Sequence, residues 1–212
     1  MQRIDTADAI DEGLARLCAA DPRLVEVCRV AGPVPLRRTD PGFESLVSII
    51  ISQQVSKASA QAIFSRLKTL ANPLSAQAVL DGGNKLFRRA GLSHPKQRTM
   101  IAVAEAVISG ELDLHGLCRC DRDDAVVQMT AVHGIGLWTA EVYLLSAAGH
   151  PDIFPARDVA LQSAVGEAFA LTGRPAEKEL AALSESWRPW RSVAARLFWA
   201  YYAKTRRRDA IP

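Results

Sequence analysis

The chain has 212 residues, of which 49% are hydrophobic and 23% are charged, and its formal net charge is +3. This composition is ordinary for a globular protein, and the length allows a sizeable core in one domain or in two packed lobes. The N-terminus lacks a signal-peptide pattern and no apolar run approaches the ~20 residues of a membrane span, so we expect neither a secreted nor a membrane-spanning protein. The small positive charge permits a polyanionic partner without proving one.

Apolar residues recur at helical spacing along the chain, and no segment alternates as a strand does. Clusters of glycine and proline separate the helical segments, and the break at residues 40–42 marks a lobe boundary. The sequence therefore predicts an all-α protein. The predicted helices cover residues 6–19, 23–30, 43–51, 56–70, 73–80, 85–89, about 91–109, 121–131, 138–148, 158–169, 176–186 and 190–203.

The four cysteines do not form a metal-binding set. Cys118 and Cys120 are separated by a single residue, unlike the usual zinc-finger or thioredoxin-like spacings, and no histidine pair completes them. Cys18 and Cys28 stand far from that pair in the sequence. We expect all four to be reduced or partly buried thiols.

Residues 130–140 read Thr-Ala-Val-His-Gly-Ile-Gly-Leu-Trp-Thr-Ala and predict a tight turn that leads into a helix. The amides of Gly134, Gly136 and the first helical turn would point outward together. A helix N-terminus adds partial positive charge, so this hairpin could hold an anion such as a DNA phosphate. The same glycines could equally serve only to join two packed helices.

Asp158 follows the hairpin closely enough to share a site with it. Residues 138–148 predict a helix of roughly 16 Å. The next nine residues, 149–157, can reach about 30 Å when extended, so Asp158 can return beside the hairpin. Asp158 also fits a helix N-cap, because apolar residues recur after it at helical spacing. The two roles are compatible.

Five blocks of the sequence, in order, resemble the helix-hairpin-helix-GPD superfamily of DNA glycosylases. The hairpin at 133–140 and Phe154-Pro155 with Asp158 are similar to the motif and downstream aspartate of that superfamily. Its 3-methyladenine DNA glycosylase II type is indicated by the remaining blocks, which are residues 49–56, Gly91-Leu92-Ser93 with Lys96, and residues 187–192.

The resemblance implies an all-α fold of two helical lobes with the active-site cleft between them. Residues 1–42 would pack with 156–212 as one lobe. Residues 43–155 would form the central lobe, with the helix-hairpin-helix at about 121–148. We expect a short form without the N-terminal β domain of some relatives, because 42 residues leave no room for one.

The resemblance also implies a role for individual residues. Asp158 would be catalytic, Trp138 and Trp199 would line the base pocket, and Gln54 would fill the gap left in the duplex by the extruded nucleotide. The residues expected to bind DNA phosphates are Ser93, Lys96, Gly134, Gly136 and Thr139.

Carbonyls of Thr130, Val132 and Gly134 could hold Na⁺ or K⁺, and no other cofactor is required. The partner would be double-stranded DNA with a damaged base. We expect the protein to be a monomer and, if the source is bacterial, to be cytoplasmic and associated with the nucleoid.

The implied reaction is hydrolysis of the N-glycosidic bond of alkylated purines after base flipping, which leaves an abasic site for base excision repair. Trp138 stands where relatives with lyase activity carry a Schiff-base lysine, so we expect no lyase activity. His133 replaces a frequent proline, which should be tolerable because the contacts of the hairpin use backbone. Val142 replaces an aromatic residue of some members, which would make the pocket roomier and puts the substrate range in question.

Other interpretations are open from the residues alone. Gln54 could lie in a solvated turn, and the side chain of Lys96 could simply extend into solvent. Trp138 and Trp199 could be core residues. The protein could be a glycosylase for deaminated, etheno or mismatched bases. It could also be a non-catalytic DNA-binding module in which Asp158 only caps a helix. A helical protein-interaction scaffold is disfavoured by the five blocks together.

Overall fold

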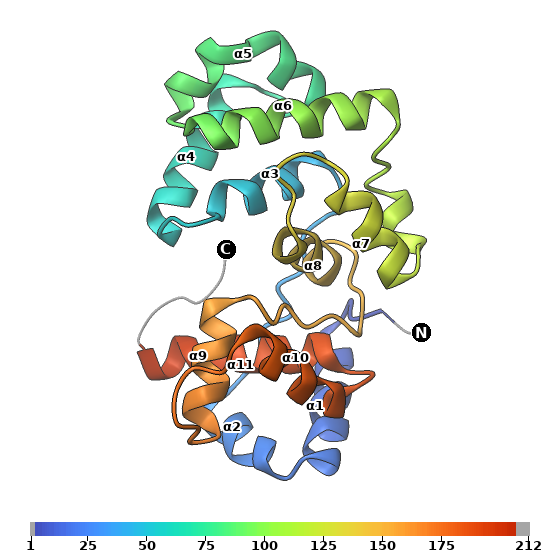
Figure 1. The fold of residues 1–212 in the computed structure, drawn as a ribbon, viewed down its shortest axis with the longest axis vertical. Coiled ribbons are helices and arrows are strands. Elements are labelled where there is room, and N and C mark those ends of the chain that lie inside the picture. Colours follow the sequence, from blue (N-terminus) through green and yellow to red (C-terminus); the bar gives the residue numbers. More distant parts are fainter. Residues whose placement is uncertain (1–2, 207–212) are drawn as a thin grey trace. The chain divides into compact units, whose positions relative to one another are not determined.

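The computed structural model describes residues 3–206, and these residues form helices joined by short connections, with no strand among them (Figure 1). The all-α prediction is confirmed. The chain divides into two compact units, residues 3–38 with 149–206 and residues 39–148. Within the described range, no helix is both long and apolar enough to cross a membrane.

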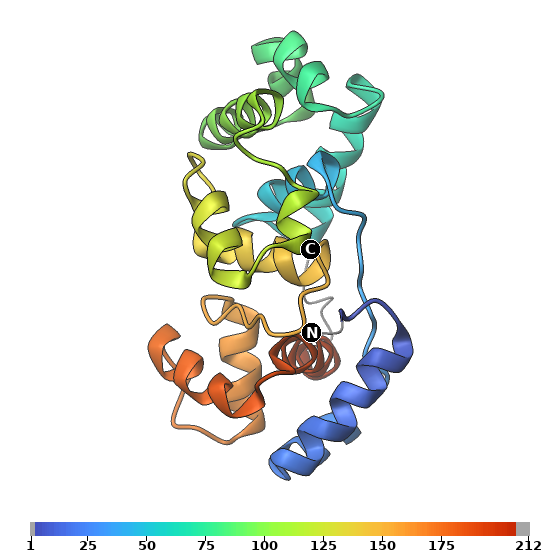
Figure 2. The ribbon, with the colours of Figure 1, turned by 90° about the vertical axis from the view of Figure 1, so that its right-hand side faces the viewer.

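Unit 1, residues 3–38 with 149–206, is built around its last helix, α11 (Arg191–Arg206). Residues 191–201 of α11 are all buried. Figure 2 looks nearly along α11, with α1 and α9 on either side. The helices of this unit are α1 (Ala7–Ala20), α2 (Arg23–Ala31), α9 (Val159–Ala168), α10 (Glu177–Ser184), a 3-10 turn (Glu185–Trp187) and α11.

An aromatic cluster fills the core of unit 1. The ring of Trp187 lies 5.1 Å from that of Phe198 and 5.2 Å from that of Phe154, between centroids. The indole N–H of Trp187 donates to the carboxylate of Asp21 at 3.2 Å, so its polar group is satisfied inside the core. Trp187 is therefore a core residue of unit 1.

Unit 2, residues 39–148, is built around the apolar helix α3, which packs against α4, α6 and α8. Leu46, Val47 and the run 49–51 of α3 are buried, as a helix that is apolar nearly all round requires. The helices of this unit are α3 (Phe43–Ser52), α4 (Lys57–Leu70), α5 (Ala76–Ala90), α6 (His94–Ser109), a 3-10 turn (Gly116–Arg119), α7 (Arg122–Thr130) and α8 (Leu137–Ser146).

Unit 2 follows the sequence prediction at one local detail and differs from it at two. The interruption predicted at residues 81–84 is a kink at Gly83, whose φ of 47° and ψ of −147° are not helical, and it divides α5 into two helical stretches. This helix begins at Ala76 and not at residue 73, because the Ser75 hydroxyl accepts the amide of Ala78 as an N-cap. The 3-10 turn at Gly116–Arg119 was not predicted.

The four cysteines are free and partly buried. Cys18 and Cys28 lie side by side with their sulfur atoms 3.4 Å apart, which their sequence separation did not suggest. Burial raises the pKa of Cys28 to about 12, which keeps this thiol protonated at neutral pH. No cluster of three or more acidic, histidine or cysteine side chains suited to a metal ion occurs in the described part of the chain.

Candidate functional site

The glycine turn between α7 and α8 has the geometry of a helix-hairpin-helix. Gly134 has a φ of +83°, and a Cβ at this position would overlap the side chain of Thr99 on α6. The buried Ile135 anchors the turn, and its amide donates to the carbonyl of Val132 at 3.1 Å. Gly134 thus meets both a conformational and a packing requirement that no other residue satisfies.

The exposed end of the hairpin is the N-terminus of α8. Gly136 is the N-cap of α8, is exposed, and provides no side-chain cap. The first amides of a helix have no intrahelical carbonyl to bind, so they are donors for an outside acceptor. Together with the partial positive charge of the helix end, they are the donors through which the predicted anion would bind.

The other residues expected to bind phosphate have different surroundings. Ser93 is exposed at the N-cap of α6 without making a side-chain cap. Lys96 is half-buried, and its ammonium donates to the carbonyls of Ile51 at 2.5 Å and Gln53 at 2.9 Å. Thr139 is only 1% exposed, and its hydroxyl accepts from the side-chain amide of Gln53 at 2.8 Å. The last two side chains support the loop after α3, a function that the sequence did not reveal.

That loop carries Gln54, the residue expected to enter the duplex. Gln54 is exposed and has a φ of +57°, in the left-handed region. Trp138, in the first turn of α8, is half-buried. Unit 2 therefore brings together Gln54, its supporting residues and the hairpin. Sequence reasoning missed Gln53, although it lies inside a recognised block, because only its contact with Thr139 distinguishes it from Gln54.

Asp158 and Trp199 belong to unit 1 and contact each other directly. Asp158 is the N-cap of α9, and its Oδ1 accepts the amide of Leu161 at 3.0 Å. The same oxygen accepts the indole N–H of Trp199 at 3.2 Å. Trp199 comes from α11 and is 2% exposed, so its ring is held by the core of the unit. The carboxylate is thereby fixed from two helices.

The segment before Asp158 is fixed as well. The amide of Asp158 donates to the carbonyl of Pro155 at 2.9 Å, and the side chain of Gln162 donates to the carbonyl of Ala156 at 2.9 Å. These contacts form a tight turn in front of α9. The position of the carboxylate is consequently determined by backbone contacts and by Trp199 together.

The carbonyls suggested for a monovalent cation lie in the hairpin turn. The carbonyl of Val132 accepts the amide of Ile135, which leaves a second lone pair of that oxygen for another contact. Backbone oxygens are hard ligands of the kind that Na⁺ and K⁺ accept. The carbonyls of Thr130, Val132 and Gly134 would be the ligands of such an ion.

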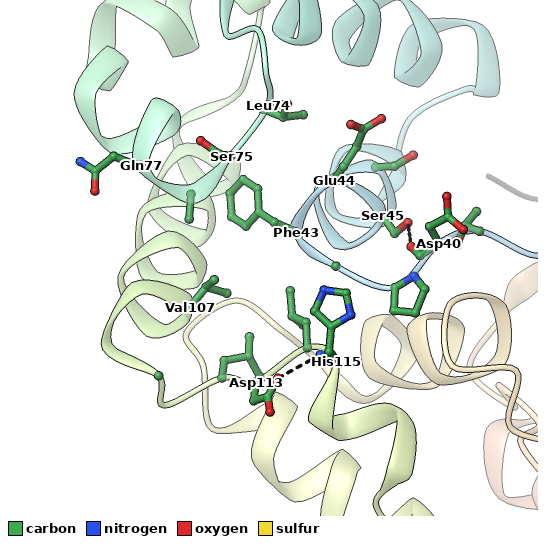
Figure 3. A pocket seen from close by; sticks show the side chains of 18 of the residues that line it. Asp40, Phe43, Glu44, Ser45, Leu74, Ser75, Gln77, Val107, Asp113 and His115 are labelled. Atoms are coloured by element: carbon green, nitrogen blue, oxygen red, sulfur yellow. Dashed lines mark hydrogen bonds between the residues drawn. The ribbon is translucent and has the colours of Figure 1, made fainter.

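A separate hollow of about 1020 Å³ lies at the other end of α3 in unit 2 (Figure 3). Phe43, Leu74 and Val107 provide apolar walls, and His115 and Asp113 stand at its edge. Asp113 accepts the backbone amides of His115 and Gly116, and these bonds lower the pKa of its carboxyl group. None of the predicted site residues lines this hollow.

The fold and these sites define a class of protein: an all-helical protein with a glycine hairpin and an aspartate that caps the helix after it. The family comparison is specific. Residues 47–189 match the model of the HhH-GPD superfamily base excision DNA repair proteins, and the chain belongs to this superfamily. The resemblance seen in the sequence is thus confirmed.

Several known proteins are similar to the chain. A probable bifunctional transcriptional activator/DNA repair enzyme of Mycobacterium tuberculosis is 32% identical over 93% of the chain, which spans 41% of that protein. DNA-3-methyladenine glycosylase 1 of Schizosaccharomyces pombe is 28% identical over 74% of the chain and 71% of its own length.

Solved structures agree with the fold. A DNA-3-methyladenine glycosidase of Bacillus halodurans is 29% identical, with a TM-score of 0.78 over 96% of the chain and 91% of its own. The S. pombe 3-methyladenine DNA glycosylase in complex with abasic DNA has a TM-score of 0.84 over 95% of the chain and 100% of its own, at 24% identity. The second likeness shows the fold alone.

Proposed function

We propose that the protein is a DNA glycosylase that hydrolyses the N-glycosidic bond of alkylated purines, such as 3-methyladenine and 7-methylguanine, and leaves an abasic site. Membership of the base excision repair superfamily supports the general activity. The printed names of the S. pombe and B. halodurans relatives support the choice of lesion. The single observation that carries the catalytic assignment is the fixed carboxylate of Asp158.

Asp158 would act on the sugar of the damaged nucleotide. Cleavage of the C1′–N bond develops oxocarbenium-like positive charge on the sugar, which a nearby carboxylate stabilises. The carboxylate can also orient water and accept its proton as the hydroxyl oxygen bonds to C1′. Because Leu161 and Trp199 already hold Oδ1, little reorganisation is needed when this charge appears.

The damaged base itself favours this reaction. A base in a duplex must be flipped out before its glycosidic bond can be reached, and a poorly paired base costs the least to extrude. An alkylated purine is cationic, so aromatic faces attract it and it leaves without strong acid assistance. In this proposal the half-buried ring of Trp138 recognises the base. Trp199, which is only 2% exposed, lines the base pocket from the core and orients Asp158 through its indole N–H.

The enzyme would be monofunctional. A lyase step requires an amine that displaces the base and forms a Schiff base with C1′. The hairpin carries Trp138 at the position where relatives with lyase activity carry that lysine. Water is then the only nucleophile in the proposal, and the product is an abasic site with both DNA strands intact.

The hairpin would bind the phosphate backbone of double-stranded DNA through the amides at Gly134, Gly136 and the start of α8. Na⁺ or K⁺ on the carbonyls of Thr130, Val132 and Gly134 would assist binding without a part in bond cleavage. We further propose that the protein acts as a monomer on cytoplasmic, nucleoid-associated DNA.

The test is release of free base from alkylated duplex DNA by the wild type and by Asp158→Asn. Asparagine caps helices as well as aspartate does, so this variant keeps the bonds from Leu161 and Trp199 while it loses the charge. Asp121→Asn is the matched control, because Asp121 caps α7 in the same way by accepting the amide of Asp123.

We expect wild type and Asp121→Asn to release base, and Asp158→Asn to bind DNA with a loss of at least about 100-fold in the rate of release. Full activity of Asp158→Asn would overturn the catalytic assignment. Release only from deaminated, etheno or mismatched substrates would keep the enzyme class and refute the alkylated-purine specificity. Binding without release from any lesion would leave a non-catalytic DNA-binding module.

A further inference from the structure

The loop between α3 and α4 adopts a conformation that needs support. Gln54 has a φ of +57°, a region that residues other than glycine seldom occupy. A residue stays in this conformation when contacts with the surrounding structure hold its backbone there. The side chain of Gln54 is exposed, so these contacts must act on the residues next to Gln54 in the loop.

Lys96 supplies one of these contacts from the first turn of α6. Its ammonium donates to the carbonyl of Ile51, in the last turn of α3, and to the carbonyl of Gln53, in the loop. Carbonyls at a helix C-terminus lack intrahelical partners and carry partial negative charge, so a cation is well placed there. Burial lowers the pKa of Lys96, as expected for an ammonium held against the protein.

Gln53 supplies the second contact, toward the hairpin. Its side-chain amide donates to the hydroxyl of Thr139 at 2.8 Å. Thr139 lies in the first turn of α8 and is 1% exposed, so its hydroxyl is a rigid acceptor. The loop is therefore fixed to α6 through its main chain and to α8 through a side chain.

We propose that Lys96 and Gln53 are positioning residues that hold Gln54 in the conformation needed to enter the duplex, and that Lys96 is not a phosphate contact. This inference rests on the proposed function, because it assumes that Gln54 fills the gap left by a flipped nucleotide. Two of the three protons of the Lys96 ammonium are donated to carbonyls of the same chain. The hydrogen bond between Gln53 and Thr139 sets the distance between the loop and the hairpin.

The first measurement needs no DNA. Lys96→Met removes both hydrogen bonds and keeps an apolar stem of similar length, and Lys85→Met, on the exposed side of α5, is the control with the same change in charge. We expect amide hydrogen exchange in residues 50–55 to accelerate in Lys96→Met and to stay at the wild-type rate in Lys85→Met. Unchanged exchange in both variants would overturn the proposal.

The second measurement separates positioning from phosphate binding. Loss of one phosphate contact reduces the slope of log affinity against log salt by about 0.9 on duplex DNA. We expect Lys96→Met to keep the wild-type slope on undamaged duplex and to reduce single-turnover release of an alkylated base roughly tenfold. A slope reduced by about one with unchanged exchange in the loop would identify Lys96 as a phosphate contact.

A double-mutant cycle tests whether Lys96 acts through Gln54. If it does, Lys96→Met added to Gln54→Ala reduces base release no further than Gln54→Ala alone. Additive losses would refute the proposal. Gln53→Leu, which removes only the bond to Thr139, provides a second variant if Lys96→Met folds poorly. If the wild type releases no base from any lesion, the proposed function fails, while hydrogen exchange still decides whether Lys96 and Gln53 hold the loop.

Discussion

Replacement of Gly134 by alanine tests the hairpin most directly. At a φ of +83° an L-residue costs roughly 1–2 kcal/mol relative to glycine. The new Cβ would also lie 2.8 Å from both Cβ and Cγ2 of Thr99 and would overlap its hydroxyl, and such overpacking costs roughly 1–3 kcal/mol. The sum predicts a loss of roughly 2–5 kcal/mol in the free energy of unfolding.

Gly136 is the matched position in the same turn. It has a φ of −90°, which any residue can adopt, and an added Cβ would meet no atom within 4 Å. Gly136 is the N-cap of α8, where alanine is less favourable than glycine, so Gly136→Ala should cost only about 0.5–1 kcal/mol. Its φ and its open surroundings both differ from those of Gly134, so the pair tests the conformational and packing requirements of Gly134 together.

Thermal unfolding followed by circular dichroism measures the difference. For a chain of this size a loss of 2–5 kcal/mol lowers Tm by roughly 5–15 °C. Thr99→Ala should restore part of the stability of Gly134→Ala, since it removes the hydroxyl and methyl that the new Cβ overlaps, and the φ penalty should remain. Equal Tm values for Gly134→Ala and Gly136→Ala would refute the reasoning.

Two further predictions concern the active site and the DNA surface. Trp199→Phe removes the indole donor to Asp158, so base release should slow roughly tenfold in single-turnover assays. Because Trp199 is buried, the smaller ring leaves a cavity, and Tm should fall as well. A normal rate would show that Leu161 alone orients the carboxylate. Ser93→Ala should leave the denaturation midpoint unchanged, because Ser93 makes no side-chain cap, and should weaken binding to undamaged duplex several-fold if its hydroxyl contacts phosphate. Ser56→Ala, which removes a real N-cap bond, should instead cost about 1 kcal/mol in chemical denaturation.

Local rules predicted most of the helices. Thr6 and Ser56 accept backbone amides as N-caps at helix starts that the sequence predicted. The cap at Ser75 lies two residues after the predicted start of its helix. Gly91 and Gly110 follow α5 and α6 in the left-handed conformation that ends a helix. These signals lie within a few residues of the feature that they determine, so a single sequence contains them.

Contacts across long separations were not predictable in the same way. Tyr143 is buried in α8, where its hydroxyl donates to the carbonyl of Leu114 and accepts the amide of Gly42, and burial raises its pKa. Arg196 in α11 donates to the carbonyl of Leu36, 160 residues away in the sequence. Such pairs depend on how the helices pack, and neither partner carries a local pattern that identifies the other.

Lys96 shows what this limit means for a site. A lysine in the first turn of a helix, beside an exposed serine, is reasonably expected to face a phosphate. The structure places its ammonium on carbonyls of residues 51 and 53 instead, more than 40 residues earlier in the chain. The block was recognised correctly, but the role of the side chain depended on a contact that only the packing of α3 against α6 creates.

Asp158 combines both kinds of information. Its position as an N-cap follows from local sequence, and Asp121 caps α7 by the same rule without any sign of a catalytic role. The cap therefore explains why an aspartate is tolerated there and fixes its rotamer against the first turn of α9. What distinguishes Asp158 is the indole of Trp199, which arrives from α11 and fixes the same oxygen a second time. A carboxylate held from two directions is already oriented before the sugar becomes charged, so the distant tryptophan is the contact that makes this cap a credible catalytic group.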